Sequence, residues 1–137
     1  MDYLLEVEKE GDAWVISMPA IPEFNSVAYS VDDIYAQSLD AFELALDFYT
    51  ETKRPIPLGE AVNSANYALS VPTTLTAKIY LYNEWLNSNQ TKTDLASKVG
   101  TPKQNFNRLF DFKYKSKIET IESALAALGK RLDLTLS

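Results

Sequence analysis

The chain has 137 residues, of which 46% are hydrophobic and 23% are charged, and its formal net charge at pH 7 is −6. These values are typical of a globular protein with one or two small domains, and they exclude a disordered or fibrous chain. The sequence contains no cysteine and no histidine, which excludes disulfides, thiol nucleophiles, imidazole bases and the usual zinc ligand sets.

No apolar stretch is long enough to span a bilayer, and the N-terminus lacks the basic flank and long apolar region of a signal peptide. We therefore expect a cytoplasmic protein with no membrane partner.

The charge is divided unevenly along the chain. Residues 1–70 contain 13 acidic and three basic residues, a net charge of −10, whereas residues 71–137 contain six acidic and ten basic residues, a net charge of +4. This asymmetry is typical of an acidic half that binds a protein partner, joined to a half that binds nucleic acid.

The N-terminal residues predict a small α+β domain. Alternation of apolar and polar side chains predicts two strands, from Tyr3 and from Trp14, which are joined by a turn at residues 9–12. A short third strand is expected at residues 27–29, with Ser30 as a candidate N-cap of the helix that follows.

That helix is expected to continue to about Thr52, because apolar residues recur at spacings of three and four. The face expected to pack on the sheet comprises Tyr35, Leu39, Phe42, Leu46 and Tyr49. The opposite face is acidic, which is typical either of a solvated surface or of a face that docks a partner. It comprises Asp33, Asp40, Glu43, Asp47 and Glu51.

A last strand is expected at residues 67–71, so that residues 1–71 form a β-β-β-α-β domain. One helix covers one face of such a sheet and leaves an edge or a face free for another chain. Pro72 marks the boundary of a second, all-α domain at residues 72–137, which begins with a helix carrying Leu75, Ile79, Tyr82 and Leu86 on one side.

Residues 91–110 have the pattern of a helix-turn-helix. Leu95 and Val99 lie on one helical face, Gly100 supplies the left-handed backbone of a tight turn, and Pro102 suits the first turn of a second helix. The exposed side chains of this second helix suit base edges, because arginine and lysine pair with guanine and asparagine and glutamine pair with adenine. They are Lys103, Gln104, Asn105, Asn107 and Arg108.

Lysines surround this motif, and residues 90–117 carry seven basic and two acidic residues. Lys113, Lys115 and Lys117 alternate just after the second helix and are expected to contact phosphates. The alternative is a lysine cluster that only increases solubility.

The C-terminal residues predict a further helix at residues 117–128, with Gly129 as its C-cap, and then a short strand. The apolar members of that strand are Leu132, Leu134 and Leu136. A lone strand in a helical domain has no partner, so we expect it to pair with a second copy and to make a homo-oligomer, at least a dimer.

Several short segments together resemble the HicB antitoxins of bacterial type II toxin-antitoxin pairs, in the branch with a C-terminal helix-turn-helix domain. The resemblance covers nearly the full length. In the first half it is carried by residues 14–18 with the turn at 19–22, by Asp47-Phe48-Tyr49, by Ile56-Pro57-Leu58 and by Val71-Pro72. In the second half it is carried by residues 100–104, Arg108-Leu109-Phe110, Lys117-Ile118 and residues 127–130.

The resemblance implies a partial ribonuclease-H-like N-terminal domain that binds and masks a HicA-type toxin, an mRNA-cleaving ribonuclease. It implies that the C-terminal domain binds double-stranded operator DNA in the promoter of its own operon and represses it. Lys103, Gln104, Asn105 and Arg108 correspond to base-reading positions, and Lys92 and Thr101 correspond to phosphate contacts. Charge complementarity agrees, since a basic RNA-binding toxin is attracted to an acidic domain.

Candidate toxin-binding residues lie on or just after the second strand, where an exposed aromatic side chain would anchor an interface. They are Trp14, Met18, Glu23 and Phe24. Trp14 and Phe24 are equally suited to the hydrophobic core.

We expect no catalytic residues, no metal and no other cofactor. A ribonuclease-H-type site needs converging carboxylates, and the spacing of the acidic residues does not place them in one cluster. Two alternatives remain open: a free-standing transcription regulator whose N-terminal domain senses a small molecule, and a metal-dependent nuclease.

Overall fold

The computed structural model describes residues 1–63 and 66–136. The chain divides into two compact units, unit 1 at Met1–Pro72 and unit 2 at Thr73–Ser137. This division falls within one residue of the boundary expected from the sequence.

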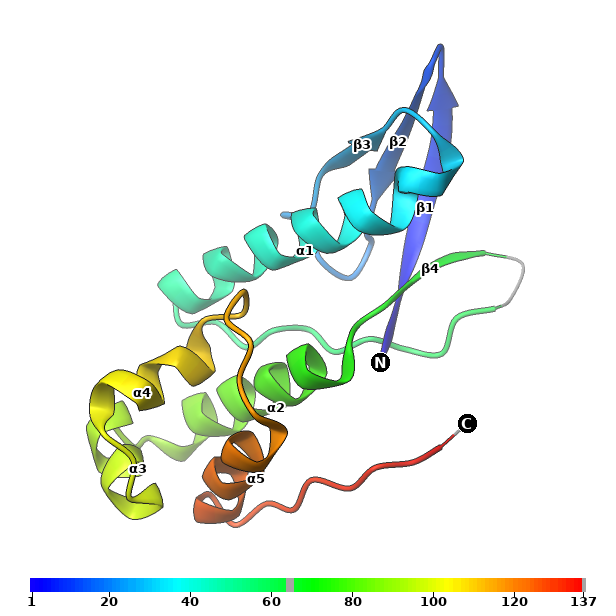
Figure 1. The fold of residues 1–137 in the computed structure, drawn as a ribbon. Coiled ribbons are helices and arrows are strands. Elements are labelled where there is room, and N and C mark those ends of the chain that lie inside the picture. Colours follow the sequence, from blue (N-terminus) through cyan, green and yellow to red (C-terminus); the bar gives the residue numbers. More distant parts are fainter. Residues whose placement is uncertain (64–65, 137) are drawn as a thin grey trace. The chain divides into compact units, whose positions relative to one another are not determined.

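Over its described residues, unit 1 contains a four-stranded antiparallel sheet and one long helix (Figure 1). The strands are β1 (Asp2–Glu10), β2 (Ala13–Ser17), β3 (Ser26–Ala28) and β4 (Tyr67–Ser70), in the spatial order β3-β2-β1-β4. β1 and β2 form a hairpin in which Glu10 pairs with Ala13. Gly11 in the turn has a φ of +59°, the left-handed conformation that two-residue hairpin turns require.

Helix α1 (Ile34–Glu51) covers one face of the sheet and follows a short 3-10 turn, η1 (Val31–Asp33). The buried face of α1 agrees with the sequence at Phe42, Leu46 and Tyr49, but the expectation for Tyr35 is wrong, because its side chain is 47% exposed. Ile34, one position earlier, is buried instead.

The expected N-cap also differs. Ser30 makes no side-chain capping hydrogen bond, since η1 lies between it and α1.

The core of unit 1 lies between α1 and the covered face of the sheet. Tyr3 and Leu69 are adjacent across β1 and β4, and both are fully buried. The Tyr3 ring packs 4.9 Å from the Phe42 ring, and its hydroxyl donates a hydrogen bond to the Pro57 carbonyl at 2.6 Å. On the opposite face, Glu6 and two further glutamates of β1 alternate toward solvent and contribute to the acidic character of the unit.

Unit 2 is helical over its described residues 73–136. Its helices are α2 (Thr73–Ser88), α3 (Lys92–Val99), α4 (Lys103–Asn107) and α5 (Ile118–Ala127), and a 3-10 turn, η2 (Arg108–Phe110), continues α4. Small residues allow the helices to approach closely, with an alanine from each of α2, α3 and α5 in the core. The buried core comprises Ala77, Leu81, Leu95, Ala96, Phe106, Leu109, Ile121, Ala124 and Leu125.

α3 and α4 lie where the sequence predicts helices, and their ends explain the short connection. Thr91 caps α3, because its Oγ1 accepts a hydrogen bond from the Asp94 N–H at 3.0 Å. Gly100 ends α3 with a φ of +77°. Pro102 is the N-cap of α4 and stands just before its first turn, one position earlier than expected.

The expected C-terminal strand is not formed within the single chain. Residues 130–136 have no strand hydrogen bonding, and the described part of unit 2 contains no strand with which they could pair. Leu132 packs against the helical core, whereas Leu134 and Leu136 are 86% and 99% exposed.

Candidate functional site

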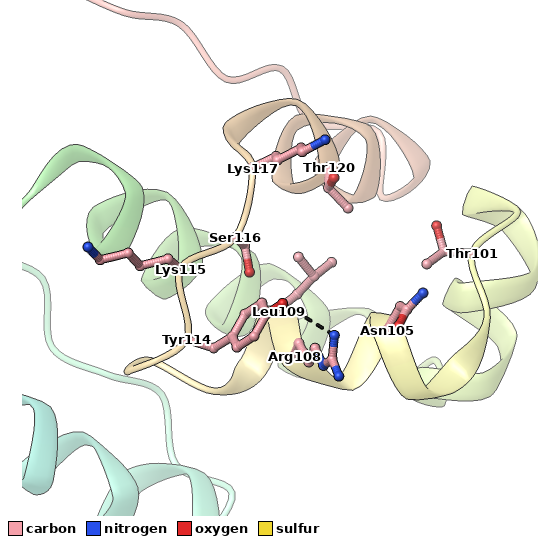
Figure 2. Close-up of a pocket in the computed structure, with 9 residues that line it drawn as sticks. All are labelled: Thr101, Asn105, Arg108, Leu109, Tyr114, Lys115, Ser116, Lys117 and Thr120. Carbon is pink, nitrogen blue, oxygen red and sulfur yellow. Dashed lines mark hydrogen bonds between the residues drawn. The ribbon is translucent and has the colours of Figure 1, made fainter.

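A basic groove lies on unit 2, between α4, η2, the loop that follows η2, and the start of α5 (Figure 2). Of the ten residues expected to contact DNA, five line this groove: Thr101, Asn105, Arg108, Lys115 and Lys117. It is also lined by Leu109, Tyr114, Ser116 and Thr120.

The two walls of the basic groove present different chemistry. Figure 2 shows Asn105 and Arg108 on the wall formed by α4 and η2, and Lys117 and Thr120 on the wall formed by α5. Lys117 is the N-cap of α5, where the helix dipole adds partial positive charge. An anion in the groove would therefore meet basic side chains and a helix N-terminus, while the amide of Asn105 offers both a donor and an acceptor.

The Arg108 side chain is held by Tyr114, a residue that the sequence analysis missed. Arg108 Nη1 donates a hydrogen bond to the Tyr114 hydroxyl at 3.2 Å, and the guanidinium carbon lies 5.0 Å from the centre of the Tyr114 ring. These contacts keep the guanidinium at the groove (Figure 2). In the sequence, Tyr114 lies between Lys113 and Lys115, and this position was the only pattern that indicated a role for it at the same surface.

A second missed residue, Lys78 of α2, lies behind the groove. Its side chain is buried, at 1% exposure, and its Nζ donates hydrogen bonds to the carbonyl oxygens of Arg108 at 3.2 Å, Asp111 at 2.8 Å and Tyr114. Burial lowers the pKa of Lys78 to about 8, although the Asp111 carboxylate acts in the opposite direction. In the sequence, Lys78 occupies an otherwise apolar helical face, three residues after Leu75.

The remaining expected DNA contacts lie outside the groove lining. Lys103, Gln104 and Asn107 are exposed on α4, and Lys113 is exposed on the loop after η2. Lys92, the first residue of α3, is turned toward aromatic rings, with its Nζ 4.7 Å from the Phe110 ring centre and 5.2 Å from that of Trp85.

In unit 1, two of the four expected toxin-binding residues are buried. Met18 and Phe24 are each 2% exposed and belong to the core, so in this structure they offer no surface to a partner. Trp14 is half-buried, with the Lys9 ammonium 4.9 Å above its ring.

Glu23 ties the loop after β2 to the end of α1. The Tyr49 hydroxyl donates a hydrogen bond to Glu23 Oε1 at 2.5 Å, and Arg54 Nη2 donates to Oε2 at 3.2 Å. The hydrogen bond from Tyr49 is the main reason that the pKa of Glu23 is lowered, and burial together with the Glu23 carboxylate raises the pKa of Tyr49 to about 12.

A second concave surface, the β3–α1 groove, lies on unit 1 and carries exposed apolar side chains. Val27, Leu44 and Phe48 are 41%, 56% and 53% exposed, and the carboxylates of Glu23 and Asp40 lie at the same surface. β3 is an edge strand, with a neighbour on one side only among the described strands. The other lining residues are Asn25, Ser26, Gln37, Ala41 and Ala45.

Within residues 1–63 and 66–136, no three or more acidic residues gather closely enough to hold a metal ion. No helix in these ranges has the length and apolar character needed to cross a membrane.

The fold is that of a mixed α/β protein, with an N-terminal antiparallel sheet and helix followed by a helical region. Residues 2–80 match the family model described as the HicB_like antitoxin of bacterial toxin-antitoxin system. The chain therefore belongs to the HicB-like antitoxin family.

Similarity to relatives extends over both units. The chain is 36% identical to antitoxin HicB of Pseudomonas fluorescens over 137 residues, covering 98% of this chain and 93% of the relative. It is 35% identical to antitoxin HicB of Escherichia coli, covering 90% and 89%, and 34% identical to antitoxin HicB 2 of Photorhabdus laumondii, covering 98% and 95%. The chain thus has the role of an antitoxin in a toxin-antitoxin pair, and this membership favours regulation rather than catalysis.

Proposed function

We propose that this antitoxin neutralises a HicA-type mRNA-cleaving toxin through unit 1 and represses its own operon by binding operator DNA through unit 2. The observation that carries the proposal is the separation of charge between two compact units, with a basic groove on the positively charged one. Both proposed partners occur in the cytoplasm, where we place the protein.

DNA binding is supported by the form of unit 2. α3, the turn at Gly100 and α4 are read as a helix-turn-helix, and the exposed side chains of α4 suit base edges in the major groove. Lysines of the loop and of the start of α5 would then fix the position of the protein on the phosphates. The proposed DNA contacts are Lys92, Thr101, Lys103, Gln104, Asn105, Asn107, Arg108, Lys113, Lys115 and Lys117.

Toxin binding is assigned to unit 1 because residues 1–70 have a net charge of −10. A ribonuclease that binds a polyanion is expected to be basic, and an acidic unit would attract it. Within unit 1, exposure favours the β3–α1 groove over Met18 and Phe24. Leu44 and Phe48 offer apolar contact area, and Glu23 and Asp40 supply negative charge beside them. Because this groove is open and charged, a protein surface suits it better than a small molecule does.

Self-association is the third part of the proposal. The apolar side chains of Leu134 and Leu136 are exposed on an extended segment, and pairing with the same segment of a second copy would satisfy its main-chain groups and cover these side chains. A two-fold dimer would present two basic grooves to a palindromic operator.

The test uses the full chain together with the product of the small open reading frame beside its gene. Phe48→Asp is expected to lose inhibition of mRNA cleavage by that product while keeping promoter binding. The double variant Lys115→Glu/Lys117→Glu is expected to show the reverse. Tyr29→Asp is the matched control for the first variant, because Tyr29 is 75% exposed and lies outside the β3–α1 groove.

Each arm contradicts a different part of the proposal. Full inhibition of the toxin by Phe48→Asp would contradict the β3–α1 groove as the toxin-binding surface. If the neighbouring gene product is neither toxic nor bound by this chain, the proposed neutralisation of that partner is wrong. Unchanged promoter binding after the charges of both lysines are reversed would contradict the basic groove as the DNA-binding surface.

A further inference from the structure

Lys78 is charged and buried, yet it lies on α2 and not on either proposed DNA-binding helix. Its ammonium group has three N–H donors, and three carbonyl oxygens accept them, from Arg108, Asp111 and Tyr114. These acceptors are spaced three residues apart along the turn that follows the proposed recognition helix. A single side chain therefore holds the main chain of the 108–114 segment at both of its ends and at its middle.

The carbonyl groups that accept from Lys78 lie at and after the end of the helical segment formed by α4 and η2. The last carbonyls of a helix have no intrahelical donor, and a positive charge near them is favourable. Two backbone hydrogen bonds also close the segment, from Asp111 N–H to the Arg108 carbonyl at 3.2 Å and from Tyr114 N–H to the Asp111 carbonyl at 3.1 Å. Lys78 joins these two successive turns to one point on α2.

The same segment sets the position of the Arg108 side chain. Tyr114 holds the Arg108 guanidinium through its hydroxyl and its ring, and the carbonyl of Tyr114 is in turn held by Lys78. The Lys78 ammonium also lies 5.6 Å from the centre of the Tyr114 ring. Movement of this segment would shift both the arginine and the lysines that follow Tyr114 (Figure 2).

We propose that Lys78 is a positioning residue for operator binding, which acts from the interior of unit 2 by fixing the 108–114 segment that carries Tyr114 and places Arg108 at the basic groove. This inference rests on the proposed DNA binding and deepens it. Lys78 itself contacts no DNA.

If Lys78 positions the 108–114 segment, operator binding should depend on whether Lys78 is protonated. A lysine with a purely structural role would not produce this pH dependence. A neutral amine has two N–H donors and a lone pair, so Lys78 then loses its hydrogen bond to one of the three carbonyls. Burial brings the pKa of this group to about 8. The Asp111 carboxylate acts on this ammonium electrostatically, and the Tyr114 ring lies 5.6 Å from it. The Arg108 guanidinium lies 5.0 Å from the centre of the same ring.

Stability and DNA binding are therefore expected to respond to pH in opposite directions. The folded-state pKa lies below the ordinary value of 10.5, so the unfolded chain binds more protons between about pH 8 and 10.5, and this group raises the free energy of unfolding as pH increases through that window. Over the same window the 108–114 segment loses a hydrogen bond, and operator affinity falls.

The experiment compares the full-length wild type with Lys78→Met, Lys78→Arg and the control Lys130→Met. Lys130 is an exposed lysine of the same unit, paired with Glu84 at 3.9 Å. Binding to a duplex of the protein's own promoter is measured by fluorescence anisotropy from about pH 7 to about pH 9.5, a range in which ordinary exposed lysines stay charged. Amide hydrogen exchange of residues 108–117 and thermal unfolding are measured in the same buffers.

We expect Lys78→Met to weaken operator binding about tenfold or more, which is the effect of losing one well-placed base contact, here that of Arg108. The same variant should speed amide exchange in residues 108–117. Lys130→Met should change neither. Wild-type affinity should fall as pH rises above about 8, whereas Lys78→Arg, which stays charged, should show a flatter profile.

Unchanged affinity and unchanged exchange in a folded Lys78→Met overturn the inference. If that variant does not fold, the wild-type pH series decides, since a flat affinity profile overturns the inference and a fall without unfolding supports it. Failure of the wild type to bind its promoter at any pH refutes the proposed DNA binding instead, and the exchange data then still show whether Lys78 orders the segment.

Discussion

Arg108 is engaged through both its main chain and its side chain. Its carbonyl accepts hydrogen bonds from Lys78 Nζ and from the Asp111 N–H, and its guanidinium contacts Tyr114. A long side chain held in this way has fewer rotamers to lose when it binds, so the cost of ordering it at a base edge is smaller.

Arg108→Ala is expected to weaken operator binding by about 1 to 3 kcal/mol and to relax the preference at one base pair, because arginine reads guanine through two hydrogen bonds. Anisotropy titrations against the operator, single-base variants of it and random DNA would measure both effects. An equal loss on operator and random DNA would show that Arg108 contacts a phosphate.

The Glu23–Tyr49 pair is a second feature at the residue scale, and it makes stability depend on pH. The hydrogen bond from Tyr49 lowers the pKa of Glu23, so this carboxylate stabilises the fold above its ordinary pKa of 4.5 and loses that effect as pH falls through the lower folded value. Tyr49→Phe should therefore lower the free energy of unfolding near pH 7, and the difference from the wild type should shrink toward pH 3. Denaturant titrations at several pH values would measure it, and a difference that is constant with pH would contradict the assigned cause.

At the scale of elements, two helix ends in unit 2 rely on glycine for the same geometric reason. Gly100 after α3 and Gly129 after α5 both have a φ of +77°, and a Cβ built at either position has no atom within 4 Å. An alanine would meet no clash at either place, so its cost would be the backbone strain alone.

Gly100→Ala and Gly129→Ala are each expected to lower the stability of unit 2 by about 1 to 2 kcal/mol, the cost of left-handed backbone for a residue with a Cβ. Only Gly100→Ala should also weaken operator binding, because the turn at Gly100 sets α4 against α3. Thermal unfolding and promoter titrations of both variants would test this, and equal effects on binding would count against α4 as the recognition helix.

The C-terminal segment, residues 130–136, has no strand partner among the described residues of the single chain. Leu134→Asp/Leu136→Asp is expected to convert dimers to monomers without lowering the melting temperature of unit 2 by more than about 2 °C, since both side chains are exposed. Sedimentation velocity would measure the association state, with Thr135→Asp as the control that adds charge but keeps both leucines. Dimers that persist in the double variant would place self-association elsewhere.

At the scale of the whole molecule, the chain keeps opposite charges on different units. The net charge of −10 in residues 1–70 and +4 in residues 71–137 would attract a basic protein to one unit and a polyanion to the other. This separation reduces competition between the two proposed partners, because each partner is repelled by the unit that binds the other.

Raising the salt concentration from about 50 mM to about 300 mM should slow association with the toxin by about tenfold, with a smaller effect on dissociation, because screening removes long-range attraction first. Stopped-flow mixing of the two purified proteins would measure both rates. An association rate that does not vary with salt would mean that the acidic unit does not steer the toxin.

The elements themselves could be predicted from the sequence, because periodicity, glycine and proline act over a few residues. Alternation located β1 and β2, apolar spacing located α1 and α2, and Gly100 located the turn between α3 and α4. The charge asymmetry and five of the residues in the basic groove were equally accessible, since they depend only on composition and on which face of a short helix is polar.

Tertiary structure alone decided which side chains these elements bury or bring together. Met18 and Phe24 are buried in the core of unit 1, and Ile34 rather than Tyr35 is buried. Both outcomes depend on how the helix packs on strands that are distant in sequence. The contacts of Lys78 are the clearest case, since its acceptors lie 30, 33 and 36 residues away along the chain. Local patterns determine secondary structure, whereas contacts between distant elements determine which buried charge organises the basic groove.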